Sequence, residues 1–159
     1  MRPTWLPDLI RFEDHDGDWD RYLEAAYEIY LRDFVRSKPT FEGRILALKR
    51  HPVSGGKEAT FWHLVSSGPV EDDRLPDFRR FERIRWPRAI IDHAADPSVL
   101  VWENDHRGDR RVCLWLPTAD YLVVLARRST YTLLWTAYPA DREHTKRKLR
   151  AEYDEARKG

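Results

Sequence analysis

The sequence is poor in sulfur: it contains one cysteine, Cys113, and one methionine. A single cysteine excludes a disulfide within the chain, which fits a reducing compartment, and it excludes the paired cysteines of zinc-binding motifs. Long apolar runs are also missing, since no segment approaches the roughly 20 residues that a membrane-spanning helix needs. The first residues, Met1–Asp8, contain no apolar segment of the kind found in secretory signal peptides. We therefore expect a cytoplasmic protein that does not enter a membrane.

A net charge of one sign is absent as well, because 28 Lys and Arg residues nearly balance 27 Asp and Glu residues. The two signs are nevertheless separated along the chain: acids dominate residues 8–33, whereas residues 74–88 and 142–150 are basic. A near-neutral total can hide a polarised surface, so local patches are more informative about partners than the total. The length fits one domain over residues 1–159, and residues 1–17 are predicted to form an N-terminal arm or loop.

The N-terminal half is predicted to contain one long helix and a β-hairpin. Apolar residues recur at helical spacing over residues 18–36, with Asp18 as the candidate N-cap. Residues 60–65 are aromatic and β-branched, and residues 41–48 form a second strand candidate. The Pro- and Gly-containing turn at 52–56 separates them, so the two strands are expected to pair as a hairpin.

The C-terminal half is predicted to form two short helices, a β-meander and a final helix. After a loop at 66–76, the spacing of apolar residues indicates helices at 78–85 and 87–95. Strands are expected at 99–103, 110–116, 121–127 and 131–138, and a last helix at 141–157 with Leu149, Tyr153 and Ala156 facing inward. The short polar separators imply antiparallel pairing, and the strand at 121–127 is apolar on both faces, as in a strand covered on both sides. The predicted fold class is α+β: N-terminal helices and a hairpin packed on a mostly antiparallel sheet of four or more strands, followed by a C-terminal helix.

No pattern in the chain indicates a metal or a cofactor. The six histidines are scattered, and no His-Glu-x-x-His segment is present. The acidic run Asp14–Asp20 looks superficially like a calcium-binding loop, but Trp19 stands where such a loop needs glycine and Ala25 where it needs glutamate. A solvated, acidic helix start explains this run better. We therefore predict that no metal and no cofactor is used, and that Cys113 is a small buried side chain rather than a nucleophile.

Three separated groups of residues carry candidate chemistry. His63 could accept a proton from a ribose 2′-hydroxyl near neutral pH, or it could be a hydrogen-bonded core residue. Arg79 and Arg83 lie one helical turn apart and could bind phosphate through paired hydrogen bonds, although a solvated helix face explains them equally well. Thr136 and Tyr138 share one face of the last strand and could orient a phosphate beside the basic final helix. Their strand propensity alone also accounts for them.

These segments resemble a group of phage- and mobile-element-associated bacterial proteins in the barnase/EndoU/colicin/RelE-like (BECR) RNase superfamily. The resemblance covers roughly residues 60–155 and is carried by Phe61–His63, Arg79–Trp86, Leu114–Leu116, Asp120–Leu125 and Trp135–Tyr138. It implies a compact domain in which helices lead into a four-stranded antiparallel sheet. It also implies a metal-independent RNase or toxin.

The resemblance would make His63 a general acid or base, Arg79 and Arg83 ligands of the phosphate or the transition state, and Thr136 and Tyr138 positioning residues for the phosphate. The leading hypothesis is therefore an endoribonuclease, toxin-like or phage-linked, that cleaves RNA by attack of the 2′-hydroxyl. The alternative is a non-catalytic module of the same fold that binds nucleic acid or protein. The expected partners are RNA and a protein antitoxin or immunity partner.

Overall fold

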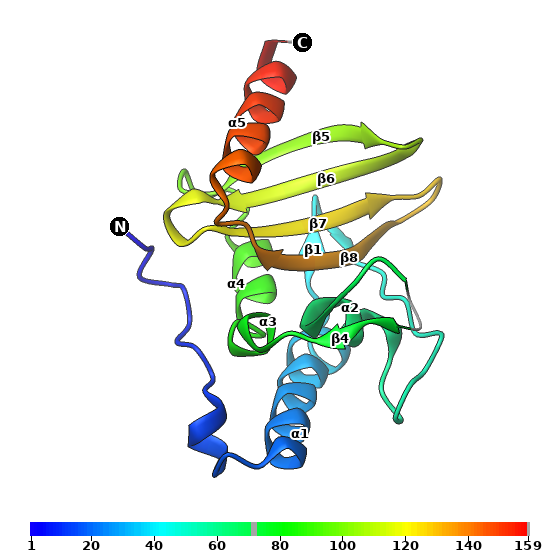
Figure 1. Ribbon diagram of the computed structural model, residues 1–159. Coiled ribbons are helices and arrows are strands. Elements are labelled where there is room, and N and C mark those ends of the chain that lie inside the picture. The colour runs from blue at the N-terminus through cyan, green and yellow to red at the C-terminus, as the bar shows by residue number, and fades with distance from the viewer. Residues whose placement is uncertain (71–72, 159) are drawn as a thin grey trace.

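The centre of the molecule is a four-stranded antiparallel sheet, seen here in a computed structural model that describes residues 1–70 and 73–158. Its strands are β5 (Leu100–His106), β6 (Asp109–Leu116), β7 (Tyr121–Arg127) and β8 (Thr132–Pro139). They pair in chain order, so the predicted meander and the α+β class are confirmed (Figure 1). The short connections explain this order, because parallel neighbours would need long crossovers. The turn between β5 and β6 holds Arg107 and Gly108 at positive φ, the backbone conformation that a tight two-residue hairpin loop requires.

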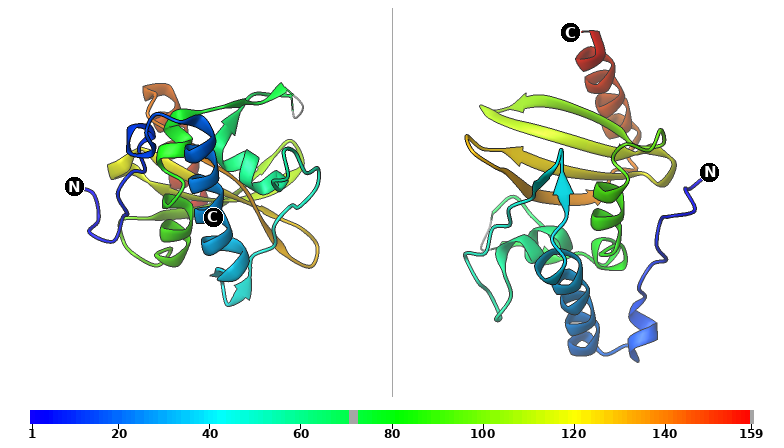
Figure 2. Two further views of the ribbon diagram at one scale, coloured as in Figure 1. Left: turned by 90° about the horizontal axis from the view of Figure 1, so that it is seen from below. Right: turned by 180° about the vertical axis from the view of Figure 1, so that it is seen from behind.

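The two faces of the sheet are covered by different helices. Strand β7 is buried along Tyr121–Ala126, as its double apolar pattern predicted. On one face, Val123 and Leu125 join the core formed with the helices from the first two-thirds of the chain. On the other face lies α5 (Glu143–Lys158), whose Leu149 packs with the strand residues Trp102 and Trp115 (Figures 1 and 2).

The predicted inward face of α5 is only partly correct. Leu149 is buried and Tyr153 packs edge-on against Trp102, with 5.8 Å between the ring centroids. Ala156, however, is exposed. The last turns of α5 extend past the sheet, so nothing covers this position (Figure 1).

The N-terminal segment leads into the predicted long helix. Residues 1–11 form no helix or strand, and η1 (Phe12–His15) is a short 3-10 helix. Helix α1 (Trp19–Tyr30) follows and continues as the π-helical η2 (Leu31–Arg36), which together match the predicted helix at 18–36. Asp18 is the N-cap, since its carboxylate accepts the backbone N–H of Arg21 at 3.1 Å.

The predicted hairpin of residues 41–48 and 60–65 is wrong. Residues 60–65 lie in helix α2 (Ala59–Val65), where Phe61, Leu64 and Val65 are buried in the core. Their spacing of three and four residues also suits one face of a helix, and packing of that face overrides the strand propensity of aromatic and β-branched residues. The segment at 41–48 instead contributes to a two-stranded turn, β1 (Thr40–Phe41) and β2 (Arg44–Ile45), and then Ala47 pairs in parallel with Leu133 of β8.

The segment between α2 and the sheet is made of short elements. Strand β3 (Ser66–Ser67) pairs with β4 (Leu75–Pro76), followed by α3 (Phe78–Glu82) and α4 (Trp86–Asp92). Residues 71–72 of the expected loop at 66–76 lie outside the described residues, as does residue 159. Helix α3 ends at Glu82, so it is shorter than the predicted helix at 78–85. The helix predicted at 87–95 is present as α4, with Pro87 in its first turn. None of the helices in residues 1–70 and 73–158 combines the length and apolar character needed to cross a membrane.

Cys113 provides a chemical test of this packing. Its side chain is buried between the sheet and α5, and burial raises the pKa of the thiol to about 12. Because the thiolate is the reactive form, we expect the folded protein to react very slowly with Ellman's reagent at mildly alkaline pH. Unfolding in guanidinium chloride should release the thiol to react at once. Fast reaction of the folded protein would contradict the buried position of Cys113.

Candidate anion-binding site

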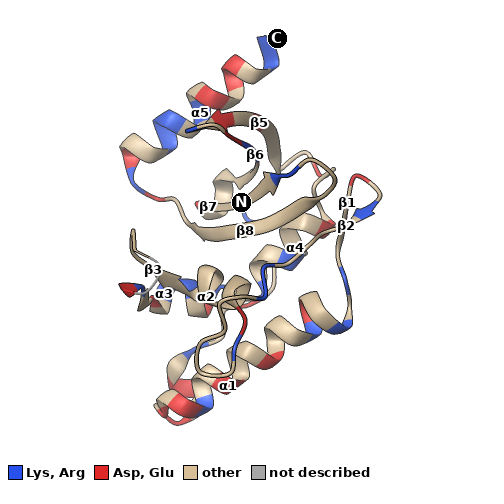
Figure 3. Ribbon diagram, turned by 90° about the vertical axis from the view of Figure 1, so that its right-hand side faces the viewer, with Lys and Arg blue, Asp and Glu red and all other residues tan. Residues whose placement is uncertain are grey.

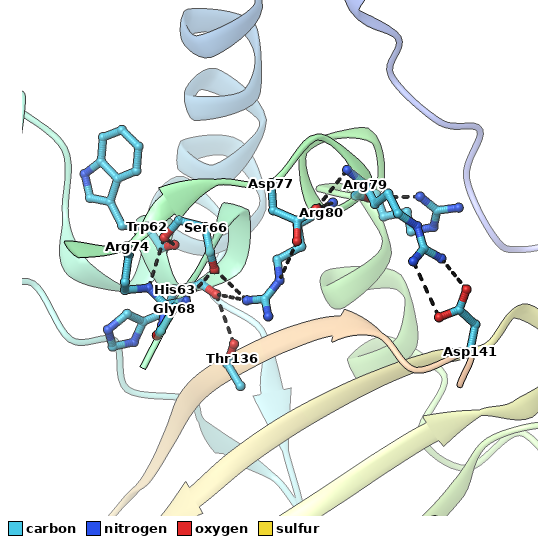
Figure 4. Close-up of polar contacts among 11 residues, drawn as sticks. Trp62, His63, Ser66, Gly68, Arg74, Asp77, Arg79, Arg80, Thr136 and Asp141 are labelled. Atoms are coloured by element: carbon cyan, nitrogen blue, oxygen red, sulfur yellow. Dashed lines mark hydrogen bonds and ion pairs between the residues drawn. The ribbon is translucent and has the colours of Figure 1, made fainter. Parts of the chain in front are cut away.

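The candidate site lies where the end of α2 meets the sheet edge at β8. Three of the five residues singled out by the sequence, His63, Thr136 and Tyr138, line one cavity of about 260 Å³. Two arginines that the sequence did not single out, Arg74 and Arg80, line it as well. Figure 4 shows the polar contacts that join these segments. We call this cavity the His63 pocket.

Hydrogen bonds fix His63 against β8. The Thr136 hydroxyl donates to the backbone oxygen of His63 at 3.0 Å, and His63 Nδ1 lies 3.2 Å from the backbone oxygen of Trp135. A carbonyl oxygen can only accept, so Nδ1 must carry the hydrogen in this contact. A neutral His63 ring then has its lone pair on Nε2, the arrangement that a general base needs. His63 is only 3% exposed, and it lines the cavity.

Arg80 lines the same cavity and is hydrogen-bonded to the backbone of α2. Its Nη1 donates to the backbone oxygens of His63 and Ser66 at 3.2 and 2.7 Å, and its guanidinium lies 5.2 Å from the Tyr138 ring centroid. Burial lowers the pKa of Arg80, and nearby Arg74 lowers it further, while Asp77 opposes the shift. Within the described residues, Nη2 of Arg80 has no hydrogen-bond partner. Its Nε lies 3.7 Å from the Asp77 carboxylate, so the Nη2 edge of the guanidinium is the part that could bind an anion.

Arg74 brings a second guanidinium to the same place. Its Nε donates to the Ser66 hydroxyl at 3.0 Å, and its Nη1 donates to the Gly68 backbone oxygen at 3.1 Å. Its Nη2 also donates to the Ser66 backbone oxygen, which accepts from Arg80 as well. His63 and Arg74 each make at least one further interaction. Two guanidinium groups thus converge on one carbonyl, and both of their positive charges border the His63 pocket.

Arg79 and Arg83 are not brought into this pocket. Arg79 is exposed and donates to the Asp141 carboxylate from Nη2 at 2.9 Å (Figure 4). The Arg83 guanidinium donates to the Arg79 backbone oxygen and lies 5.1 Å from the Trp86 ring centroid. Helix α3 ends at Glu82. Arg80 lies between the two predicted arginines in the sequence, and its side chain is the one that faces β8. The basic segment was thus found from the sequence, but the arginine that contributes to the pocket was not.

No distinctive signal in the sequence could have selected Arg74 or Arg80. Both belong to the basic stretch at 74–88, in which one arginine looks like the next. The one available hint is Asp77, because an acidic N-cap fixes where α3 begins and therefore which way each arginine points. Asp77 accepts the backbone N–H groups of Arg79 and Arg80 at 3.0 and 3.3 Å.

Comparison of the chain with models of known protein families, with curated protein sequences and with solved structures gave no match. Within residues 1–70 and 73–158, no three His, Cys, Asp or Glu side chains come together as a metal site would require. The chemistry of the pocket therefore has to be argued from its own residues: one imidazole, two guanidinium groups and two hydroxyls.

Proposed function

We propose that the protein is a metal-independent endoribonuclease that binds the scissile phosphate in the His63 pocket. The observation that carries this proposal is the convergence of His63, Arg74, Arg80 and Tyr138 on one cavity. Transfer of a phosphoryl group to an internal hydroxyl needs three kinds of group: a base, positive charge and a hydroxyl donor. They come from three stretches of the chain that are far apart in sequence.

In the proposed reaction, Nε2 of His63 takes the proton of a ribose 2′-hydroxyl. The 2′-oxygen forms a bond to the adjacent phosphorus, and the bond from phosphorus to the 5′-oxygen of the next nucleotide breaks. The leaving 5′-oxygen takes up a proton from solvent, so the products are a 2′,3′-cyclic phosphate and a 5′-hydroxyl. Arg74 and Arg80 stabilise the charge that builds up on the phosphoryl oxygens, the role first predicted for Arg79 and Arg83.

The two hydroxyl residues have different roles in this proposal. The Tyr138 hydroxyl orients a phosphate oxygen, and burial raises the pKa of this group, which keeps it in the protonated, donating form. Thr136 already donates its hydrogen to the His63 backbone, so it is a positioning residue that holds α2 on β8. The resemblance to the BECR superfamily adds the expectation of a toxin-like or phage-linked enzyme. An antitoxin or immunity protein would then inhibit it by covering this pocket.

A second candidate is a non-catalytic module that binds nucleic acid or protein. It is favoured by two observations: the arginines donate to backbone oxygens, as structural arginines do, and His63 is almost fully buried. In that case the imidazole is a core residue hydrogen-bonded to Trp135, and the pocket holds an anion without cutting it.

Incubation of the full-length protein with total RNA in excess EDTA separates the two candidates. The endoribonuclease should produce fragments whose 5′ ends polynucleotide kinase can label without prior dephosphorylation, because cleavage leaves 5′-hydroxyl groups. Binding of intact RNA in a gel-shift assay would overturn the nuclease and support the binding module. The absence of both cleavage and binding would contradict RNA as the partner.

A further inference from the structure

The His63 pocket has a neighbour on each side. The first, which we call the Trp62 pocket, has a volume of about 440 Å³ and shares Arg74 with the His63 pocket. The second, which we call the Tyr131 pocket, has a volume of about 490 Å³ and shares Trp135 with the His63 pocket. The His63 pocket therefore lies between the other two, sharing one lining residue with each, and the order is Trp62 pocket, His63 pocket, Tyr131 pocket.

Charge distinguishes these three pockets from two other hollows of the molecule. The described residues that line them include four permanently charged side chains, all of them basic: Lys49, Arg74, Arg80 and Arg128. Two other hollows contain acidic residues, Asp8 and Asp14 in one and Asp120 and Asp154 in the other. Figure 3 shows that α5 carries acidic as well as basic residues along its length. Unlike those two hollows, the three neighbouring pockets have a lining whose charged side chains, among the described residues, are all basic.

Aromatic rings lie in the two flanking pockets. Trp62 is partly exposed in the first, with its indole N–H donated to the Ser54 backbone oxygen at 3.0 Å. Tyr131 is 49% exposed in the second, beside the partly exposed Trp135, whose ring lies 5.7 Å from Lys49 Nζ. Aromatic rings beside basic groups commonly bind unpaired nucleotides, since every base has a π face that can stack and every nucleotide carries a phosphate that basic groups attract.

We propose that the three pockets form one track for single-stranded RNA, with bases stacked on Trp62 and on the Trp135 and Tyr131 rings at either side of a phosphate in the His63 pocket. This inference rests on the proposed function for its choice of RNA. It adds that the substrate must be unpaired: the bases of a duplex stack on one another and cannot also stack on these rings. The basic residues would follow the backbone without reading sequence, so the track predicts low sequence preference.

Binding to an uncleavable probe tests the track independently of catalysis. We would measure fluorescence anisotropy of a labelled oligouridylate with 2′-O-methyl groups, which lacks the attacking hydroxyl. We call Trp62, Trp135 and Tyr131 the platform residues. Each of the variants Trp62→Ala, Trp135→Phe and Tyr131→Ala removes or reduces one stacking surface. The two alanine variants should weaken binding on the order of 5- to 150-fold, and Trp135→Phe by less, because a smaller ring remains. The same probe annealed to its complement should bind wild type more weakly than the single strand.

Phe78→Ala is the matched control for Tyr131→Ala, because Phe78 is 48% exposed and lines none of the three pockets. It should leave binding unchanged. If the platform variants cleave RNA and bind the probe as tightly as wild type does, the track is overturned and the proposed nuclease activity is not. Platform-dependent binding by a protein that cuts no RNA would support the track and overturn the nuclease. Equal binding of duplex and single strand, or no binding at low salt, would overturn the track.

Discussion

Replacing His63 by asparagine should reduce RNA cleavage on the order of 10²- to 10⁴-fold, the usual contribution of a general base. The asparagine amide can occupy the place of Nδ1 and still donate to the Trp135 backbone oxygen, which lies 3.2 Å away in the wild type. What is lost is Nε2 and with it the proton acceptor. Initial rates on a fluorogenic RNA substrate would measure the effect. Affinity for the 2′-O-methyl probe should change little, because the substitution removes no positive charge.

His93→Asn is the matched control for this variant. His93 Nδ1 also faces a backbone oxygen, that of Ala89 at 2.8 Å, and its ring stacks on Trp5 with 4.2 Å between centroids. His93 does not line the His63 pocket, so cleavage should remain at the wild-type rate. Urea unfolding of both variants checks that each is folded under assay conditions. A folded His63→Asn protein that cleaves at the wild-type rate would exclude His63 as the base.

The sheet could be predicted from the sequence because its signals are local. The strand at 121–127 agrees residue for residue with β7, since its double apolar pattern and the short polar turns beside it allow few other structures. The α2 segment could not be assigned in this way. Trp62 and His63 sit among aromatic residues whose spacing suits a strand and a buried helix alike, and packing against the core decides between the two.

The candidate site shows the same limit. The nuclease hypothesis required a histidine, a basic segment and the end of the last strand to meet, but the sequence did not show that they do. In the structure His63 lines the cavity from a helix and not from a strand, and Arg74 and Arg80 take the place proposed for Arg79 and Arg83. Which arginine faces the cavity depends on where α3 begins and ends, to within one residue. An error of one residue rotates a helical side chain by about 100°, so a sequence pattern cannot separate Arg80 from Arg79.

Replacing Arg80 and its neighbour Arg79 by methionine should therefore give very different results. Arg80→Met removes the two charged hydrogen bonds to the His63 and Ser66 backbone oxygens, which retain Thr136 and Arg74 as donors. Because these oxygens keep one partner each and a buried guanidinium is costly to desolvate, we expect a loss of about 2 kcal/mol in the free energy of unfolding. Cleavage should fall on the order of 10²- to 10³-fold, as when one charge-stabilising donor is removed from a transition state.

Arg79→Met removes only an exposed ion pair with Asp141, so its stability should lie within about 0.5 kcal/mol of wild type and its cleavage rate should be unchanged. Arg80→Lys separates the two roles of Arg80, since it keeps a positive charge but not the planar group that bonds two carbonyls at once. If charge alone is needed for cleavage, the lysine variant should recover activity without recovering stability. If a guanidinium must contact both the backbone and the phosphate, neither should recover. A larger loss of cleavage in Arg79→Met than in Arg80→Met would move the phosphate site away from β8, to the outer side of α3.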